Sequence, residues 1–184
     1  EYILMSGAIM LIFVGISEGR SWSIDGTRYG ESLELSQQDT LVLLVNERYK
    51  IPENLYIDHN VFQLASNNMI APDIRIYSAE GSTPTLRVQF YTQEEKPVYD
   101  NMDFNWNYKN DTLRFDNYIK LAGQWRAQRV TLTLYLPENK KVLLPSQTSQ
   151  YLRNLRDFDR GVRSRLNKDK ILLIMQDGKL QPLM

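Results

Sequence analysis

The chain has 184 residues, of which 42% are hydrophobic and 24% are charged, and its 22 basic residues balance its 22 acidic ones. This composition is typical of one globular domain, alone or with an appendage, and the zero net charge gives no reason to expect a nucleic-acid partner. Cysteine is absent, and His59 is the single histidine. These counts exclude disulfides and thiolate sites and argue against zinc sites and histidine-based catalysis, so we expect no metal and no cofactor.

The first element that the sequence predicts is a membrane helix. Residues 2–16, YILMSGAIMLIFVGI, are uncharged and mostly apolar. This run falls short of the roughly 20 residues that cross a bilayer, but the chain begins at Glu1 without an initiator methionine, so we expect further helical residues upstream. The alternatives are a signal peptide and a buried helix or strand of a soluble core. We therefore assign residues 1–19 to the end of a membrane helix that does not pack into the core, and residues 20–32 to a polar juxtamembrane connector.

Short strands separated by turn-forming residues follow from residue 33 onward. Pairs such as Asn67-Asn68 and Asn110-Asp111 favour turns, and no strongly helical stretch lies between the strands. The strands expected before residue 122 are 40–46, 55–58, 61–66, 73–78, 85–92, 102–109 and 112–121. This spacing predicts an all-β domain over residues 33–184, built either as a sandwich or as a stack of β-solenoid rungs.

Strict alternation over residues 129–136 predicts the clearest strand. Its apolar residues are Val130, Leu132, Leu134 and Leu136, and they alternate with Thr131, Thr133 and Tyr135. Period-two patterning of this kind is typical of a strand with one face on a core, so we expect Leu132 to face the core and Thr133 to face water. Pro137 ends the strand because it cannot donate to a ladder, and Asn139 and Lys140 then turn the chain into a second short strand at 142–144.

The stretch after Pro145 changes character. Apolar residues from Tyr151 to Leu166 fall near helical spacing, and Ser146 or Thr148 could cap a helix start. Residues 146–169 are therefore expected as a short amphipathic helix or, alternatively, as a loop inserted in the domain. A final strand at 170–176 is then expected to form a closing hairpin through Asp177-Gly178.

Aromatic and basic side chains provide the candidates for an interaction surface. Phe104, Trp106 and Tyr108 share one face of their strand; if exposed, they would suit a sugar or peptide, but the polar residues between them claim the solvent side, which favours a place in the core. Basic residues after 150 could contact anionic lipid, although Asp157 and Asp159 among them favour a solvated helix face. The resulting candidate interaction surface is Trp106, Tyr108, Arg153, Arg156, Arg160 and Arg163.

The sequence contains no candidate for a catalytic site. His59 falls between two expected strands and is interpreted as a surface turn residue. Carboxylate pairs such as Glu94 and Glu95 lack the spacing of a calcium loop or the context of a glycosidase, so they are interpreted as solvated charge. Glycine-rich phosphate-binding motifs do not occur. We therefore expect a protein that is not an enzyme.

The order of the strand segments resembles a known family. Residues 111–119, DTLRFDNYI, and 125–137, WRAQRVTLTLYLP, resemble the C-terminal region of the phage-shock-protein C (PspC) like membrane proteins of Bacteroidetes. Further similarity covers most of the chain, at 14–19 (VGISEG), 39–43 (DTLVL), 57–62 (IDHNVF) and 175–180 (MQDGKL). The resemblance implies a cytoplasmic part and a membrane block that precede an extracytoplasmic, toast-rack-type β domain related to the β-solenoids of adhesin-like proteins.

The resemblance also implies a function. A PspC-like protein would lie in the inner membrane through its N-terminal helix, with the β domain in the periplasm, and would act in the envelope stress response by contacting other envelope components. The alternative is an adhesin-type β domain that binds a glycan or a protein, and a carbohydrate-active enzyme using scattered carboxylates comes third. We expect no nucleic-acid partner in any of these cases.

Overall fold

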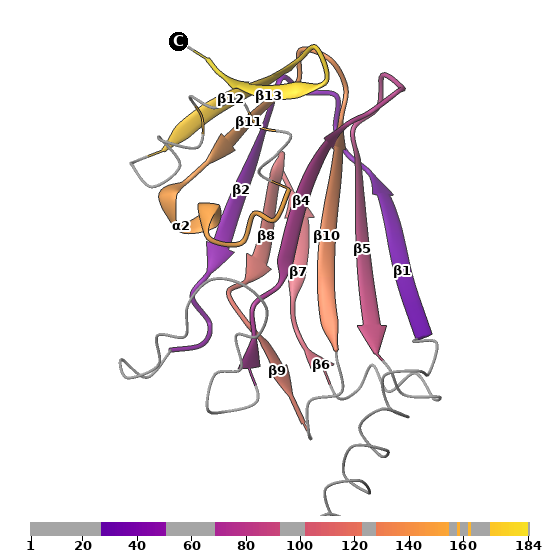
Figure 1. Cartoon of the computed structure of the whole chain (residues 1–184), viewed down its shortest axis with the longest axis vertical. Coiled ribbons are helices and arrows are strands. Elements are labelled where there is room, and N and C mark those ends of the chain that lie inside the picture. Colours follow the sequence, from indigo (N-terminus) through magenta and orange to yellow (C-terminus); the bar gives the residue numbers. More distant parts are fainter. Residues whose placement is uncertain are drawn as a thin grey trace, which may run out of the picture.

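The computed structural model describes residues 27–50, 69–92, 102–122, 128–154, 158, 162 and 170–183. Within these ranges the chain is mostly β, with the short helix α2 at Ser146–Ser149 (Figure 1). The strands are β1 (Thr27–Glu34), β2 (Thr40–Asn46), β3 (Met69–Ile70), β4 (Asp73–Ser78), β5 (Thr85–Thr92), β6 (Met102–Asp103), β7 (Trp106–Lys109), β8 (Thr112–Asp116), β9 (Ile119–Leu121), β10 (Arg129–Leu136), β11 (Lys141–Leu144), β12 (Ile171–Gln176) and β13 (Lys179–Pro182).

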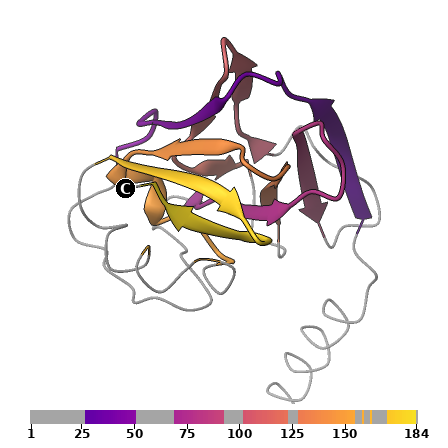
Figure 2. The same ribbon diagram turned by 90° about the horizontal axis from the view of Figure 1, so that it is seen from above.

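Two larger sheets and one small sheet organise these strands. The four-stranded sheet has the order β1-β5-β10-β4, and the six-stranded sheet has the order β13-β12-β11-β2-β8-β7. A three-stranded sheet, β3-β9-β6, lies at one end. Parallel neighbours come from distant parts of the chain, since β2 lies between β11 and β8 and β4 lies beside β10. Strand β12 pairs with β11 on the side away from β2, and β13 pairs with β12 to form a hairpin at the edge of the sheet (Figure 2).

One hydrophobic cluster joins the two larger sheets. Every second residue of their central strands points into it, as the pleat of a strand requires. The fully buried residues include Leu41, Leu43, Ile74, Ile76, Leu86, Val88, Leu113, Phe115, Leu132, Leu134, Val142 and Leu144. Burial of one such side chain stabilises the fold by about 1.5–3 kcal/mol. Because strands of both larger sheets contribute to the cluster, both sheets depend on the same core.

The expected strand at 129–136 is confirmed, and so is its apolar face. Leu132 has no exposed surface. The expectation that Thr133 faces water is wrong, because this residue is only 5% exposed. Strand β10 lies between β5 and β4, and the cross-strand neighbours of Thr133 are Arg87 and Arg75. Long arginine stems on both flanks account for the burial of the shorter threonine.

Three other strands have the predicted bounds, namely β2, β4 and β5. The predicted strands 102–109 and 112–121 each divide in two, into β6 and β7 and into β8 and β9. The strands expected at 55–58 and 61–66 and the helix expected at 1–19 lie outside the described residues.

The expected connector at 20–32 needs correction at its end, because β1 begins at Thr27 and pairs with β5 over its whole length. The sequence does not predict this strand, because an edge strand that is mostly polar lacks a clear alternation of apolar residues. Even Glu31 and Leu33, on the side of the strand that faces the core, are exposed. The β structure therefore starts before residue 33. In the described part of the chain, no helix is long and apolar enough to span a membrane.

The expected helix after Pro145 is also corrected. Helix α2 ends at Ser149, and Leu152 then forms a bridge to Ile74 of β4. The Tyr151 ring packs edge-on against Phe115, with centroids 5.8 Å apart, so apolar residues that suggested a helical face are buried against strands instead. A continuous helix to residue 166 is therefore wrong, and the described part of this segment is closer to the loop alternative.

Candidate interaction face

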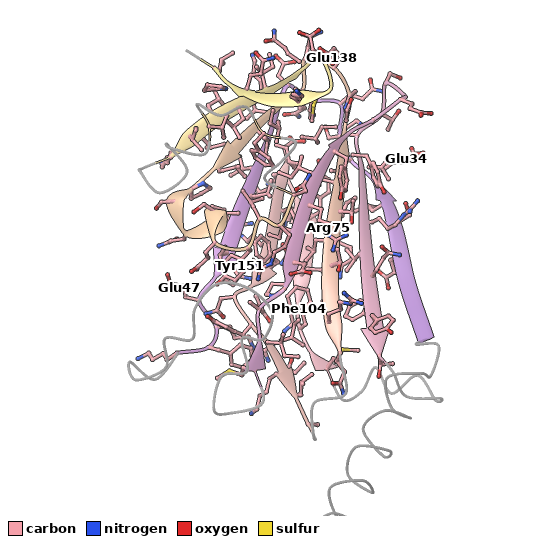
Figure 3. All side chains as sticks on the ribbon, viewed as in Figure 1. Glu34, Glu47, Arg75, Phe104, Glu138 and Tyr151 are labelled. Atoms are coloured by element: carbon pink, nitrogen blue, oxygen red, sulfur yellow. The ribbon has the colours of Figure 1, made fainter. Side chains whose placement is uncertain are left out.

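The aromatic candidates lie on β7, an edge strand of the six-stranded sheet. Phe104 is buried just before it (Figure 3), while Trp106 and Tyr108 are half-buried and pack against the core. The Tyr108 hydroxyl accepts a hydrogen bond from the Ser36 amide at 3.0 Å and donates one to Asp111 Oδ1 at 3.0 Å. Burial raises the pKa of Tyr108. These contacts agree with the expectation that the aromatic side chains face the core, and they give Tyr108 a structural role.

The basic candidates separate from the aromatic ones. Arg153 is exposed, and its Nε donates to Asp73 Oδ1 at 2.8 Å, which places it beside β4 of the four-stranded sheet. Arg156, Arg160 and Arg163 lie outside the described residues. Trp106 belongs to the other large sheet, so the described candidates do not form one continuous surface.

A different set of residues gathers on the outer face of the four-stranded sheet. We call this set the basic-aromatic face, and it consists of Arg75 and Tyr77 on β4, Arg87 and Tyr91 on β5, and Arg129 and Tyr135 on β10. Alternation with buried residues places them outward, as Arg87 between Leu86 and Val88 illustrates. Arg75 lies midway along the sheet in Figure 3. Sequence patterning could have identified each outward residue, whereas strand order and register bring them together.

Arginine and tyrosine side chains stack on this face. The guanidinium carbon of Arg129 lies 4.6 Å from the Tyr91 ring centroid, and that of Arg87 lies 5.5 Å from the Tyr135 centroid. The rings of Tyr77 and Tyr135 are 6.1 Å apart and tilted by 31°. Each cation–π contact at an exposed site stabilises by about 0.5–1 kcal/mol. The stacking holds the guanidinium groups over the rings and leaves their N–H donors available to an anion.

Charge on this face is only partly neutralised. Asp73 pairs with Arg153 and lies 3.9 Å from Arg75. Arg87 and Arg129 are exposed, and no carboxylate among the described residues pairs with either. The guanidinium group is always charged and matches the two oxygens of a carboxylate or a phosphate. This arrangement can therefore bind an anionic group from outside the domain.

A polar cluster occupies the end of the sheet where β2 and β8 finish together. Arg48 makes two hydrogen bonds to Asp103, of 2.8 and 3.0 Å, and a third of 3.0 Å to Asp116. The Tyr49 hydroxyl donates to Asp103 at 2.7 Å, and Asp116, only 2% exposed, also accepts from the Asn105 amide at 2.9 Å. Strands β2 and β8 are parallel, and their last paired residues are Asn46 and Asp116. The residues that follow these two strands therefore lie close together at one end of the sheet.

The electrostatics of the polar cluster indicate a structural role. Hydrogen bonds from Tyr49 and Arg48 lower the pKa of Asp103. Burial and the neighbouring Asp103 raise the pKa of Tyr49 to about 12. Arg48 already supplies the cation that the two carboxylates require, and among the described residues no group of three His, Cys, Asp or Glu side chains is arranged to hold a metal ion. The cluster therefore fastens strand ends to one another.

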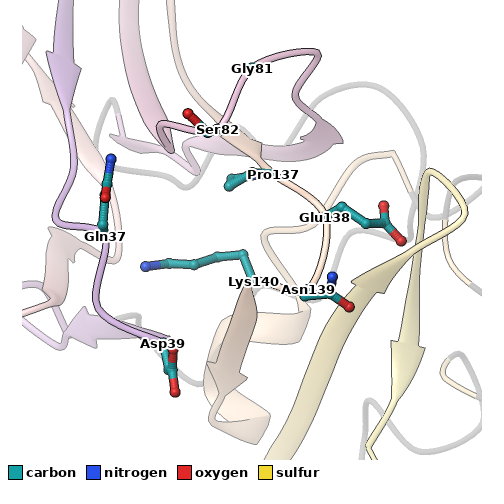
Figure 4. A pocket seen from close by; sticks show the side chains of 8 residues that line it. All are labelled: Gln37, Asp39, Gly81, Ser82, Pro137, Glu138, Asn139 and Lys140. Carbon is teal, nitrogen blue, oxygen red and sulfur yellow. The ribbon is translucent and has the colours of Figure 1, made fainter.

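An open depression of about 390 Å³ lies at the opposite end of the strands (Figure 4). It is lined by Gln37, Asp39, Gly81, Ser82, Pro137, Glu138, Asn139 and Lys140. Lys140 is 6% exposed, and its ammonium group donates to the carbonyl oxygens of Ser36 and Gln38. Desolvation lowers the pKa of Lys140. Because its donors fasten the segment before β2, this lysine acts as an anchor.

Comparison with known proteins gives one finding. A family model described as ToastRack found in some PspC matches residues 91–182, which is half of the chain and includes β6 to β13. Searches of curated proteins and of solved structures returned no match. The mostly β structure is consistent with an all-β toast-rack domain.

Proposed function

The chain belongs to the ToastRack family found in some PspC proteins, and from this premise we propose that it is the membrane-anchored, non-catalytic domain of a PspC-like envelope protein. The observation that carries the proposal is the family match over β6 to β13. In this proposal, residues 1–19 end a membrane helix in the inner membrane, and the β domain lies in the periplasm. The parallel neighbours β11, β2 and β8 support a solenoid-like stack of rungs.

The proposed activity is contact with other envelope components during envelope stress. Two observations support contact rather than catalysis. Asp103 and Asp116 make the most side-chain hydrogen bonds among the described carboxyl groups, and both form ion pairs with Arg48. The basic-aromatic face, in contrast, presents exposed guanidinium groups on a sheet, and arginine and tyrosine are among the residues enriched in the energetically dominant positions of protein interfaces.

Localisation and topology provide the first test. The full chain with a C-terminal tag is expected in the inner-membrane fraction, and protease added to spheroplasts should degrade the tagged β domain. A variant lacking residues 1–19 should appear in a soluble fraction with a β-type circular dichroism spectrum, since β1 begins at Thr27. A tag that stays protected in spheroplasts, or a truncated chain that remains with the membrane, would contradict the proposal.

Contact is tested by crosslinking from the basic-aromatic face. A photoreactive residue at Gln89, which lies between Arg87 and Tyr91 on β5, should capture a protein in intact cells. The matched control is the same photoreactive residue at the exposed position Arg114 of β8, in the other large sheet. Absence of a Gln89 adduct under envelope stress would argue against a contact role for this face.

A further inference from the structure

We propose that the basic-aromatic face binds an acidic, extended segment of a partner protein, with carboxylates of that segment held by Arg87 and Arg129. This inference rests on the proposed contact function and names the chemistry of the partner. Its basis is a pair of exposed guanidinium groups, each stacked on a tyrosine ring and neither paired with a carboxylate of the described residues.

The backbone positions of the two arginines lie at levels of the sheet whose spacing matches an extended chain. Arg129 begins β10, and Arg87 lies opposite Thr133, four residues further along the same strand. A strand rises about 3.3 Å per residue, which separates these two levels by about 13 Å. Side chains at positions i and i+4 of an extended peptide point to the same side with the same separation. Acidic residues at that interval can therefore meet both arginines at once.

The surface between the arginines admits such a segment. The intervening level carries Thr131 and Gln89, and the neighbouring positions on β1 are Gly30 and Ser32. Gly30 has no side chain, and the position that its Cβ would occupy lies 3.4 Å from Cγ of Gln89. Gly30, Ser32 and Thr131 carry no side chain or a short one, which leaves room for a peptide to lie along the sheet.

Charge and rigidity favour carboxylates as ligands. Asp73 pairs with Arg153 and lies 3.9 Å from Arg75, whereas Arg87 and Arg129 have no carboxylate partner among the described residues. A guanidinium group that stacks on a ring has lost part of its side-chain freedom before binding, which reduces the entropy cost of the complex. Its planar fork then binds both oxygens of one carboxylate.

An anionic membrane surface fits this face less well. Among the side chains that the structure describes, the face carries Arg75, Arg87, Arg129 and the neighbouring Arg153 against Asp73 and Glu34, a net charge of two. Each basic residue near anionic lipid strengthens binding about fivefold, so two net charges give only about thirtyfold. The large exposed apolar residues of the described chain are Leu33 and Leu183, and neither belongs to the basic-aromatic face. Leu33 lies opposite the core residue Leu86, and Leu183 follows β13 in the other large sheet.

The test uses the purified full chain in detergent and a fluorescein-labelled serine peptide that carries glutamate at every fourth position. Fluorescence anisotropy should show binding that weakens as salt is added. The double variant with Arg87→Gln and Arg129→Gln should bind at least about tenfold more weakly, because hydrogen bonds between charged groups are lost. Replacing both arginines by lysine should restore part of the affinity. Arg114→Gln, on the other large sheet, is the matched control and should bind like the wild type.

Three results would overturn the inference. The first is a double glutamine variant that binds as tightly as the wild type, and the second is an equal loss in Arg114→Gln. The third is face-dependent binding to phosphatidylglycerol-containing vesicles without binding to the peptide, which would assign the face to a membrane. Thermal melts of all variants provide the folding control, and the lysine variant keeps the test valid if the glutamine variant is unstable. Because the assay uses purified protein, its failure is distinguishable from a failure of the topology test.

Discussion

Leu132 and Thr133 are adjacent in β10, but they point to opposite faces of the sheet, so a charge at each position is expected to change stability by a different amount. Leu132 is fully buried in the shared core. Leu132→Asp removes about 1.5–3 kcal/mol of burial and adds the desolvation of an unpaired carboxylate, which together approach the 5–15 kcal/mol stability of a typical domain. Thr133 is also buried, but its cross-strand neighbours are Arg75 and Arg87, and it does not face the core.

The first prediction follows from this difference between the two positions. Leu132→Asp should prevent folding, whereas Thr133→Asp should lower the free energy of unfolding by about 1 kcal/mol, because the flanking arginines can pair with the new carboxylate. Urea unfolding midpoints measure both effects. Equal losses in the two variants would mean that the cover over Thr133 excludes water as completely as the core does.

Asp103 gives a prediction about pH. Tyr49 and Arg48 hold the pKa of Asp103 below its ordinary value of 3.8. A carboxyl group with a lowered folded-state pKa contributes stability above its unfolded pKa and loses that contribution as pH falls through the folded value. Asp103→Asn should therefore be less stable than the wild type near pH 7, with the difference shrinking below about pH 4. Urea unfolding across this pH range is the measurement, and a difference that stays constant with pH would refute the linkage.

At the scale of elements, residues 151–154 protect the edge of the four-stranded sheet. The Ile74 amide donates to the Tyr151 carbonyl at 2.9 Å, and the Arg153 amide donates to the Ile74 carbonyl at 2.9 Å. The Asn154 side chain continues the pairing, because its Oδ1 accepts from the Ile76 amide at 3.0 Å and its Nδ2 donates to the Ile76 carbonyl. An open edge strand is a template for aggregation, so this cover suppresses self-association through β4.

Asn154→Ala tests the role of this edge cover. The Ile76 amide should lose its protection from hydrogen exchange, while the Ile74 amide, which is bound to a backbone carbonyl, should keep it. The loss of a hydrogen-bonded partner at a half-buried site is expected to cost about 1–2 kcal/mol. Residue-resolved exchange monitored by NMR distinguishes the two amides. Equal protection of Ile76 in the wild type and the variant would show that the Asn154 side chain contributes nothing to the edge.

The same elements show what the sequence could and could not predict. The bounds of β2, β4 and β5 were predictable, because their apolar residues alternate and turn residues flank them. The segment after α2 was not, because its helical spacing of apolar residues is equally satisfied by a chain that buries them against β4. Sheet order was also out of reach, since pairing between distant strands leaves no local pattern. The basic-aromatic face depends on that order, so its members could be placed outward but not together.

Across the whole molecule, strands that are distant in the sequence are neighbours in the same sheet. This arrangement determines which fragments of the chain can fold. The family match covers residues 91–182, yet β2 lies between β11 and β8 in the six-stranded sheet. In the four-stranded sheet, β10 has β5 on one side and β4 on the other. These neighbours end before or just at the start of the matched region, and they supply core residues such as Leu43 and Val88. Among the described residues, eight of the 28 members of the core cluster are therefore absent from the matched segment alone.

The last prediction follows from this interleaving. A fragment of residues 91–184 should not fold, because β8, β10 and β11 would lose their strand neighbours and the apolar surface of the core would be exposed to water. A fragment of residues 27–184, which keeps every described strand, should fold in one cooperative transition, since a single core cluster joins both sheets. Circular dichroism and amide dispersion in NMR spectra distinguish the two fragments. A native-like spectrum from residues 91–184 would mean that the matched segment is an independent domain, and that the parallel pairing of β2 with β8 and β11 is dispensable for the fold.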